Sequence, residues 1–106
     1  MHARVTTFEI DTLRTSIAEA LTRFHELVMP ELRKQVGYRG IQVLTTPDGK
    51  GLLLSFWDSA ASAEQGIESG YYMEQVSKFV MFMRQPPGRD HYEVILSEGS
   101  ALPAQA

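Results

Sequence analysis

The segment from Gly37 to Trp57 constrains the fold of this chain more than any other. It predicts two antiparallel strands joined by a turn at Thr46-Pro47-Asp48-Gly49, where proline presets the first turn position and glycine accepts a left-handed backbone. The second strand is apolar on both faces, with alternate residues Leu52, Leu54 and Phe56 on one side and Leu53, Ser55 and Trp57 on the other. Antiparallel strands in small domains usually keep one solvated face. This sheet therefore needs cover on both sides.

A strand and a helix are predicted before the hairpin. His2–Phe8 is rich in β-branched residues and predicts the first strand. Asp11 is the predicted N-cap of the first helix. Its apolar residues recur at helical spacing, namely Leu13, Ile17, Ala20 or Leu21, Phe24, and Leu27 or Val28. Pro30 should end or kink this helix near Met29, before one further turn.

A second helical region and a last strand are predicted after the hairpin. Asp58 or Ser59 should cap the helix. Glycines weaken it, so we expect a break near Ser69-Gly70, after which the helix resumes toward Met83. His91–Ser97 is the predicted last strand. We expect residues 1–98 to form one domain and residues 99–106 to be a flexible tail.

The order β-α-β-β-α-β predicts an α+β class, ferredoxin-like fold with a four-stranded antiparallel sheet. Right-handed crossovers place both helical segments on one face of that sheet. The other face should then carry exposed apolar residues: Val43, Leu53 or Leu54, Trp57, and Val94 or Ile95. An apolar patch of this size is unusual on a monomer. We therefore expect a homodimer in which two sheets pack face to face as a dimeric α/β barrel.

Composition excludes several classes of protein. The 106 residues suit a single domain, and the absence of cysteine excludes disulfides and thiolate metal sites. A net charge of −3 argues against nucleic-acid binding, which depends on Lys and Arg. The sequence contains no apolar run long enough for a membrane span and no signal-peptide pattern at its start, so we expect a cytoplasmic protein.

Chemical motifs are sparse. The three histidines, His2, His25 and His91, are not at metal-ligand spacing, so no metal site is predicted. No glycine-rich phosphate loop and no nucleophile elbow is present. His25 adjoins the apolar stripe of the first helix, and it is the candidate base if the protein is an isomerase or a lyase.

Five short motifs in order carry a family resemblance. They are Ala3-Arg4-Val5, Met29-Pro30, Gly37-Tyr38-Arg39-Gly40, Ser55-Phe56-Trp57-Asp58-Ser59 and Tyr92-Glu93-Val94. With them, residues 3–98 resemble the dimeric α/β-barrel superfamily, most closely its antibiotic-biosynthesis-monooxygenase-like branch. The resemblance implies the ferredoxin-like fold and the dimer. It leaves the activity open, because the superfamily includes monooxygenases, isomerases and haem-handling enzymes.

The resemblance also implies candidate site residues. Haem-degrading relatives carry an Asn in the first strand and a His in the second helix, and this chain has neither, although Trp57 matches their Trp. No cofactor is therefore expected. In the cofactor-free relatives an acidic phenol lies in an apolar pocket, and the candidates here are Trp57, Tyr71, Tyr72 and Arg39 for binding, and His25, Trp57 and Tyr72 for catalysis. Each also has a plain structural role, in the core or at the surface.

Two hypotheses of function follow. The first is a cofactor-independent monooxygenase-like protein that acts on a small aromatic or polyketide-like molecule. The second is a non-catalytic small-ligand-binding or stress-associated dimer with the same cavity. In both, we expect the pocket between the helices and the sheet, with Trp57 and Tyr72 at its wall and His25 as the nearest titratable group.

Overall fold

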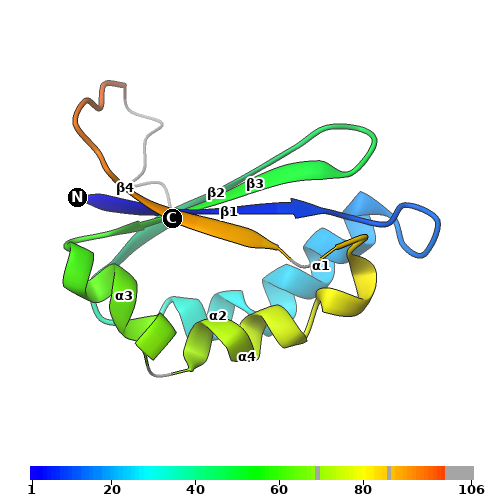
Figure 1. Cartoon of the computed structure of the whole chain (residues 1–106), viewed down its shortest axis with the longest axis horizontal. Coiled ribbons are helices and arrows are strands. Elements are labelled where there is room, and N and C mark those ends of the chain that lie inside the picture. The colour runs from blue at the N-terminus through cyan, green and yellow to red at the C-terminus, as the bar shows by residue number, and fades with distance from the viewer. Residues whose placement is uncertain (69, 86, 100–106) are drawn as a thin grey trace.

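The computed structural model describes residues 1–68, 70–85 and 87–99. A four-stranded sheet is covered on one face by helices (Figure 1). The elements are β1 (His2–Glu9), α1 (Ile17–Leu27), α2 (Met29–Leu32), β2 (Tyr38–Thr45), β3 (Lys50–Trp57), α3 (Ala60–Glu68), α4 (Tyr71–Ser77), the 3₁₀ helix η1 (Val80–Phe82) and β4 (Gly88–Glu93).

The sheet has the strand order β2-β3-β1-β4, and each neighbouring pair is antiparallel. The first helical crossover connects β1 to β2, and the second connects β3 to β4. This arrangement is the predicted ferredoxin-like βαββαβ fold. None of the described helices is long and apolar enough to cross a lipid bilayer.

The β2–β3 hairpin forms where the sequence predicts it. Thr46 and Lys50 close the turn with a backbone hydrogen bond of 2.8 Å from Thr46 N to Lys50 O. Gly49 has a φ of +96°, a value that disfavours side chains, and its position between Ile10 and Thr12 leaves no space for one. The turn is thus fixed both by local chemistry and by packing.

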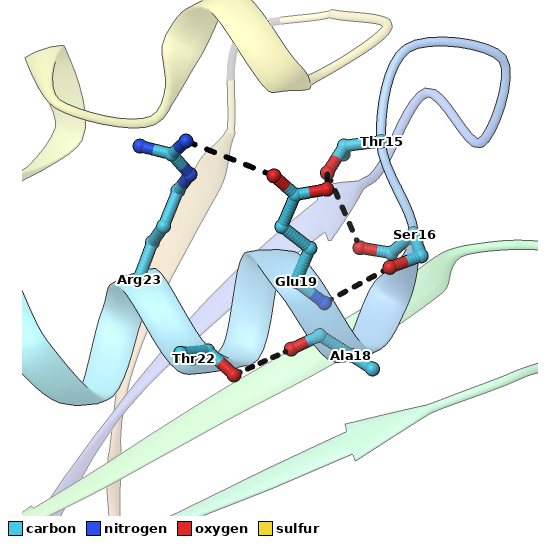
Figure 2. A network of polar contacts seen from close by, with 6 residues as sticks. All are labelled: Thr15, Ser16, Ala18, Glu19, Thr22 and Arg23. Carbon is cyan, nitrogen blue, oxygen red and sulfur yellow. Dashed lines mark hydrogen bonds and ion pairs between the residues drawn. The ribbon is translucent and has the colours of Figure 1, made fainter.

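The first helix starts later than predicted. Asp11 is not its N-cap: the Asp11 carboxylate accepts the backbone N–H of Leu13 at 3.0 Å within a turn, and Leu13 is 90% exposed. Ser16 is the cap instead, and its hydroxyl oxygen accepts the N–H of Glu19 at 3.0 Å. Figure 2 shows this Ser16–Glu19 pair and the ion pair of Glu19 with Arg23 at 3.7 Å.

The predicted helix breaks are present. Val28 separates α1 from α2, in which Pro30 occupies the first turn. Gly70, with a φ of +84°, lies between the last residue of α3 and the first residue of α4. Ser59 caps α3, since its hydroxyl oxygen accepts the N–H of Ser62 at 3.1 Å.

The last strand lies earlier in the chain than predicted, at Gly88–Glu93 rather than His91–Ser97. Its ladder with β1 ends at the pair His2–Glu93, because β1 begins at His2. One further bond joins Val94 N to Met1 O at 2.9 Å. Ile95 and Leu96 follow without a strand partner and are 89% and 85% exposed. Residues 100–106 of the expected tail lie outside the described part of the chain.

The two faces of β3 have different neighbours. Leu53, Ser55 and Trp57 point toward the helices, and Trp57 packs with Met29, Leu32 and Ala63 in the buried core. Leu52, Leu54 and Phe56 point to the opposite side, which we call the outer face. The prediction that Val43 and Trp57 lie on the outer face is wrong, and of Leu53 and Leu54 it is Leu54 that lies there. Leu44, Leu52 and Tyr92 are the large exposed side chains of this face.

Candidate functional site

A cavity of about 190 Å³ lies between the helical layer and the sheet. Its floor consists of the helix-facing residues of β1, β2 and β3, and its roof comes from α1, α2, α4, η1 and the segments beside them. Alternate β1 residues Arg4, Thr6 and Phe8 line it in sequence, so the cavity runs along this strand. A pocket in this layer was expected from the topology.

Aromatic and aliphatic side chains form most of the cavity wall. Phe24 of α1 and Phe79 pack against each other there, with ring centroids 6.0 Å apart and planes at 53°. Phe8 lies over Gly51, its partner on β3, where a Cβ would come within 2.1 Å of the ring. Gly51 therefore provides the space that holds the Phe8 ring at the wall.

The start of α1 is fixed beside this wall. Thr15 donates through Oγ1 to the Glu19 carboxylate at 3.3 Å, and Glu19 pairs with Arg23 (Figure 2). The Arg23 guanidinium carbon lies 5.4 Å from the ring centroid of Phe82, which lines the cavity. The Arg23–Phe82 contact joins α1 to η1 at the surface beside the cavity.

The polar side chains of the described cavity wall come from β1, β2, β3 and α4, and they are Arg4, Thr6, Thr45, Ser55 and Gln75. Arg4 and Ser55 are direct neighbours across β1 and β3, and Gln75 reaches the cavity from α4. All three side chains are buried, and Arg4 is only 4% exposed. The Gln75 amide oxygen accepts the Lys78 ammonium at 3.1 Å, which leaves the amide N–H₂ as a donor.

Arg4 is held from two sides. Its Nη2 donates to the backbone oxygen of Ala63 in α3. Its guanidinium carbon lies 5.1 Å from the ring centroid of Trp57, within the range of a cation–π contact. The Trp57 indole N–H in turn donates to Ser55 Oγ at 2.9 Å. Trp57 thus contacts both Arg4 and Ser55 and holds them in place at the cavity wall.

Trp57 itself is 1% exposed and is not among the cavity-lining residues. The Tyr38 ring meets it edge-on, with centroids 5.9 Å apart. Burial raises the pKa of the Tyr38 phenol, an effect that Arg33 partly offsets. This aromatic pair is therefore part of the support of the site and has no contact with its interior.

The other predicted site residues lie apart from the cavity or outside the described side chains. His25 is exposed on α1. Arg39, at the start of β2, is exposed and pairs with Asp58 at 3.2 Å. The backbones of Tyr71 and Tyr72 open α4, but their side chains lie outside the described residues.

Arg4 and Gln75 were not among the predicted site residues. Arg4 lies in the strand motif Ala3-Arg4-Val5, and strand alternation places it on the same face as Thr6 and Phe8. A charge on the buried face of a strand was the available signal. Gln75 gave no such signal, because nothing in its local sequence marks it as buried.

Acidic and imidazole groups are missing from the described lining of the cavity, where Arg4 is the one charged side chain. Likewise, within residues 1–68, 70–85 and 87–99, no group of three or more His, Asp or Glu side chains could hold a metal ion. What the described lining offers a ligand is an apolar chamber with a few hydrogen-bonding side chains, of which Arg4 carries the one charge.

Comparisons with known proteins place this fold. No family model matches the sequence, and no curated protein matches it. Among solved structures, a variant of SnoaB, a cofactor-independent oxygenase from Streptomyces nogalater, has a TM-score of 0.73 at 10% identity, covering 91% of this chain and 94% of that one. The ActVA-Orf6 monooxygenase of Streptomyces coelicolor, in complex with nanaomycin D, has a TM-score of 0.68 at 15% identity, covering 92% of each chain.

A further crystal structure, described as an antibiotic biosynthesis monooxygenase, has a TM-score of 0.68 at 14% identity, covering 91% of this chain and 100% of that one. At sequence identities this low, the structural similarity shows a shared fold but does not show a shared activity. The resemblance drawn from the sequence motifs is confirmed at that level: this chain has the fold of the antibiotic-biosynthesis-monooxygenase-like structures.

Proposed function

We propose that this chain is a cofactor-independent monooxygenase-like protein that acts on a small aromatic or polyketide-like molecule in the cavity. The observation that carries the proposal is an apolar chamber of about 190 Å³ with buried donors, Arg4, Ser55 and Gln75, in its wall. The shared fold with a cofactor-independent oxygenase and with a monooxygenase bound to nanaomycin D supports it.

The proposed reaction turns a phenol, whose keto tautomer carries an activated ring CH₂ group, into a quinone. The substrate enters as the phenolate, having already lost its phenolic proton to solvent, and this anion places electron density on the ring carbon. That carbon passes an electron to O₂ and then bonds to it, giving a peroxide that loses water to leave C=O. The balance is R₂CH₂ + O₂ → R₂C=O + H₂O, with every electron supplied by the substrate.

In this scheme the protein stabilises the anion and excludes water. Donors fixed in an apolar site stabilise developing negative charge more than water does, because they need no reorganisation. Gln75 would donate to the phenolate oxygen, Arg4 would supply the positive charge that stabilises the anion, and Trp57 would act as a positioning residue that holds Arg4 and Ser55. The roles in binding or catalysis that the sequence predicts remain predictions for Tyr71, Tyr72, Arg39 and His25.

Oxygen uptake with a panel of phenols tests this function. We expect the folded protein, in buffer with a metal chelator, to consume O₂ in proportion to the quinone formed, and Arg4→Gln to lower that rate. Heat-denatured protein is the control for autoxidation. Phenols that bind without consuming O₂ above this control would overturn the proposal.

The second candidate function is a non-catalytic ligand-binding or stress-associated protein. The described lining favours it in one respect, because it contains no carboxylate and no imidazole to act as a base. Binding without oxygen uptake is the result that it predicts in the same experiment.

We also propose that the chain forms a homodimer through its outer face. Leu44, Leu52 and Tyr92 are exposed there, and the helices cover the opposite face (Figure 1). Ile95 and Leu96 follow β4 and add further exposed apolar surface. A second copy would bury this surface, at a gain of about 25 cal/mol per Å² of apolar area.

A further inference from the structure

The polar groups in the cavity wall share one chemical property. Arg4 is a permanent cation with N–H donors and no acceptor. The Ser55 oxygen accepts the Trp57 N–H, so its own hydroxyl proton is free to point elsewhere. The Gln75 amide oxygen accepts a hydrogen bond from Lys78, and its N–H₂ group is a donor. The described wall also holds two side chains whose hydroxyls both donate and accept, Thr6 and Thr45. The described polar wall is therefore a donor-rich surface, and its one charge is positive.

A donor-rich surface with a cation selects a ligand group that accepts and carries negative charge. Charge attraction is stronger in an apolar chamber than in water, because the effective dielectric constant is lower. The guanidinium group is planar and presents its donors as a fork, which matches the two oxygens of a carboxylate. A single phenol oxygen uses that fork less fully.

We propose that the cavity takes a planar aromatic acid, with its carboxylate at the Arg4–Ser55 pair and its rings among the phenylalanines of the wall. This inference rests on the proposed function, because it assigns a substrate class to the same cavity. The rings meet Phe8, Phe24 and Phe79, and the acid group meets the two strand neighbours on β1 and β3. Arg4 is thereby the residue that determines the charge of the ligand.

Two ligands of the same shape, one anionic and one neutral, show how much the charge of the ligand contributes to binding. Isothermal titration of the full chain with 1-naphthoate and with 1-naphthamide compares an anion with a neutral molecule that has the same rings. We expect naphthoate to bind roughly 10- to 100-fold more tightly, as charge-assisted hydrogen bonds usually allow. A third titration with 1-naphthol separates the carboxylate from a phenol, and naphthol should bind more weakly than naphthoate.

Substitutions at two positions separate the effect of the Arg4 charge on binding from the effect of the shape of the cavity. Arg4→Gln should remove the preference for naphthoate and leave naphthamide binding within about 3-fold, because it removes a charge-assisted bond. Arg4→Lys should keep part of the preference, since it retains the charge without the fork. The matched control is Gly51→Ala, whose methyl group would push the Phe8 ring and so weaken both ligands alike.

Equal binding of naphthoate and naphthamide by the native chain would overturn the inference, and this result needs no variant to fold. So would tighter binding of naphthol, or an Arg4→Gln chain with a native circular dichroism spectrum that keeps the preference. These titrations involve no turnover. A chain that binds naphthoate but consumes no O₂ with phenols contradicts the proposed function alone, and one that oxidises phenols but ignores naphthoate contradicts this inference alone.

Discussion

Trp57 links the core of the molecule to the cavity through two contacts. Its indole N–H donates to Ser55, and its ring face lies against the Arg4 guanidinium. The sequence indicated Trp57 as a site residue but could not indicate that Arg4 lies between it and the cavity. Which side chain is innermost depends on the register of β1 against β3, and that register is a property of the fold.

Trp57→Phe should reveal the hydrogen bond to Ser55. The variant keeps an aromatic ring in the core but leaves the buried Ser55 hydroxyl without its donor, so we expect a loss of ~1–3 kcal/mol in the free energy of unfolding, including the smaller ring. Urea unfolding followed by circular dichroism measures it.

Tyr38→Phe is the matched control for this prediction. The Tyr38 hydroxyl oxygen is buried and has no hydrogen-bond partner in the described part of the chain. Removing it should change the unfolding free energy by less than about 1 kcal/mol, or stabilise the protein, because no bond is lost. A larger loss from Tyr38→Phe than from Trp57→Phe would contradict the account of both residues.

At the scale of elements, the chain before α1 contains two polar residues that could cap the helix, Asp11 and Ser16. Asp11 closes a turn through Leu13, whereas Ser16 and Glu19 have the spacing of a capping box and begin the helix. The cap lies close to the cavity, because Ile17 and Ala20 of the following turn line it. The beginning of this helix therefore affects both stability and the shape of the site.

Ser16→Ala should destabilise the protein by ~1 kcal/mol, the usual cost of losing an N-cap side chain. Asp11→Ala, which removes the turn contact and an ion pair at 3.4 Å with the exposed side chain of Arg14, should cost less. Thermal unfolding of the two variants side by side makes the comparison. The reverse order would restore Asp11 as the residue that starts the helix.

The elements themselves were predictable, since the hairpin turn, the Pro30 and Gly70 breaks and the order of elements along the chain follow from local chemistry. The ends of the elements were less predictable from the sequence. Val94, Ile95 and Leu96 have a strand composition, but β1 supplies no partner beyond His2, so the ladder ends at Glu93. Arg4 was missed because a charged residue in a strand usually points to solvent, and here the helices cover it.

For the whole molecule, the one-sided placement of the helices is the decisive feature (Figure 1). The helix-facing side of the sheet holds the cavity and the core, and the outer face holds Leu44, Leu52 and Leu54. The chain after β4 adds Ile95 and Leu96 to the exposed apolar surface. A dimer through the outer face would leave the cavity of each copy unobstructed by sheet packing.

Leu54→Asp should yield a folded monomer, because a charge on the outer face opposes sheet packing and leaves the core unchanged. Leu53→Asp is the paired control, since Leu53 lines the cavity, and it should impair folding or ligand binding while any folded fraction stays dimeric. Light scattering at micromolar concentration reports the mass. A native chain with the mass of one copy would remove the dimer proposal.

The alternation along β3 has a consequence for how this chain can change. Neighbouring positions on this strand belong to different surfaces, so single substitutions can alter ligand choice and self-association independently. A one-residue insertion or deletion within the strand cannot, because it would turn Ser55 and Trp57 outward and bring Leu54 and Phe56 beneath Arg4. We therefore expect natural length variation to be confined to the Thr46–Gly49 turn and the helical crossovers, with this strand varying by replacement alone.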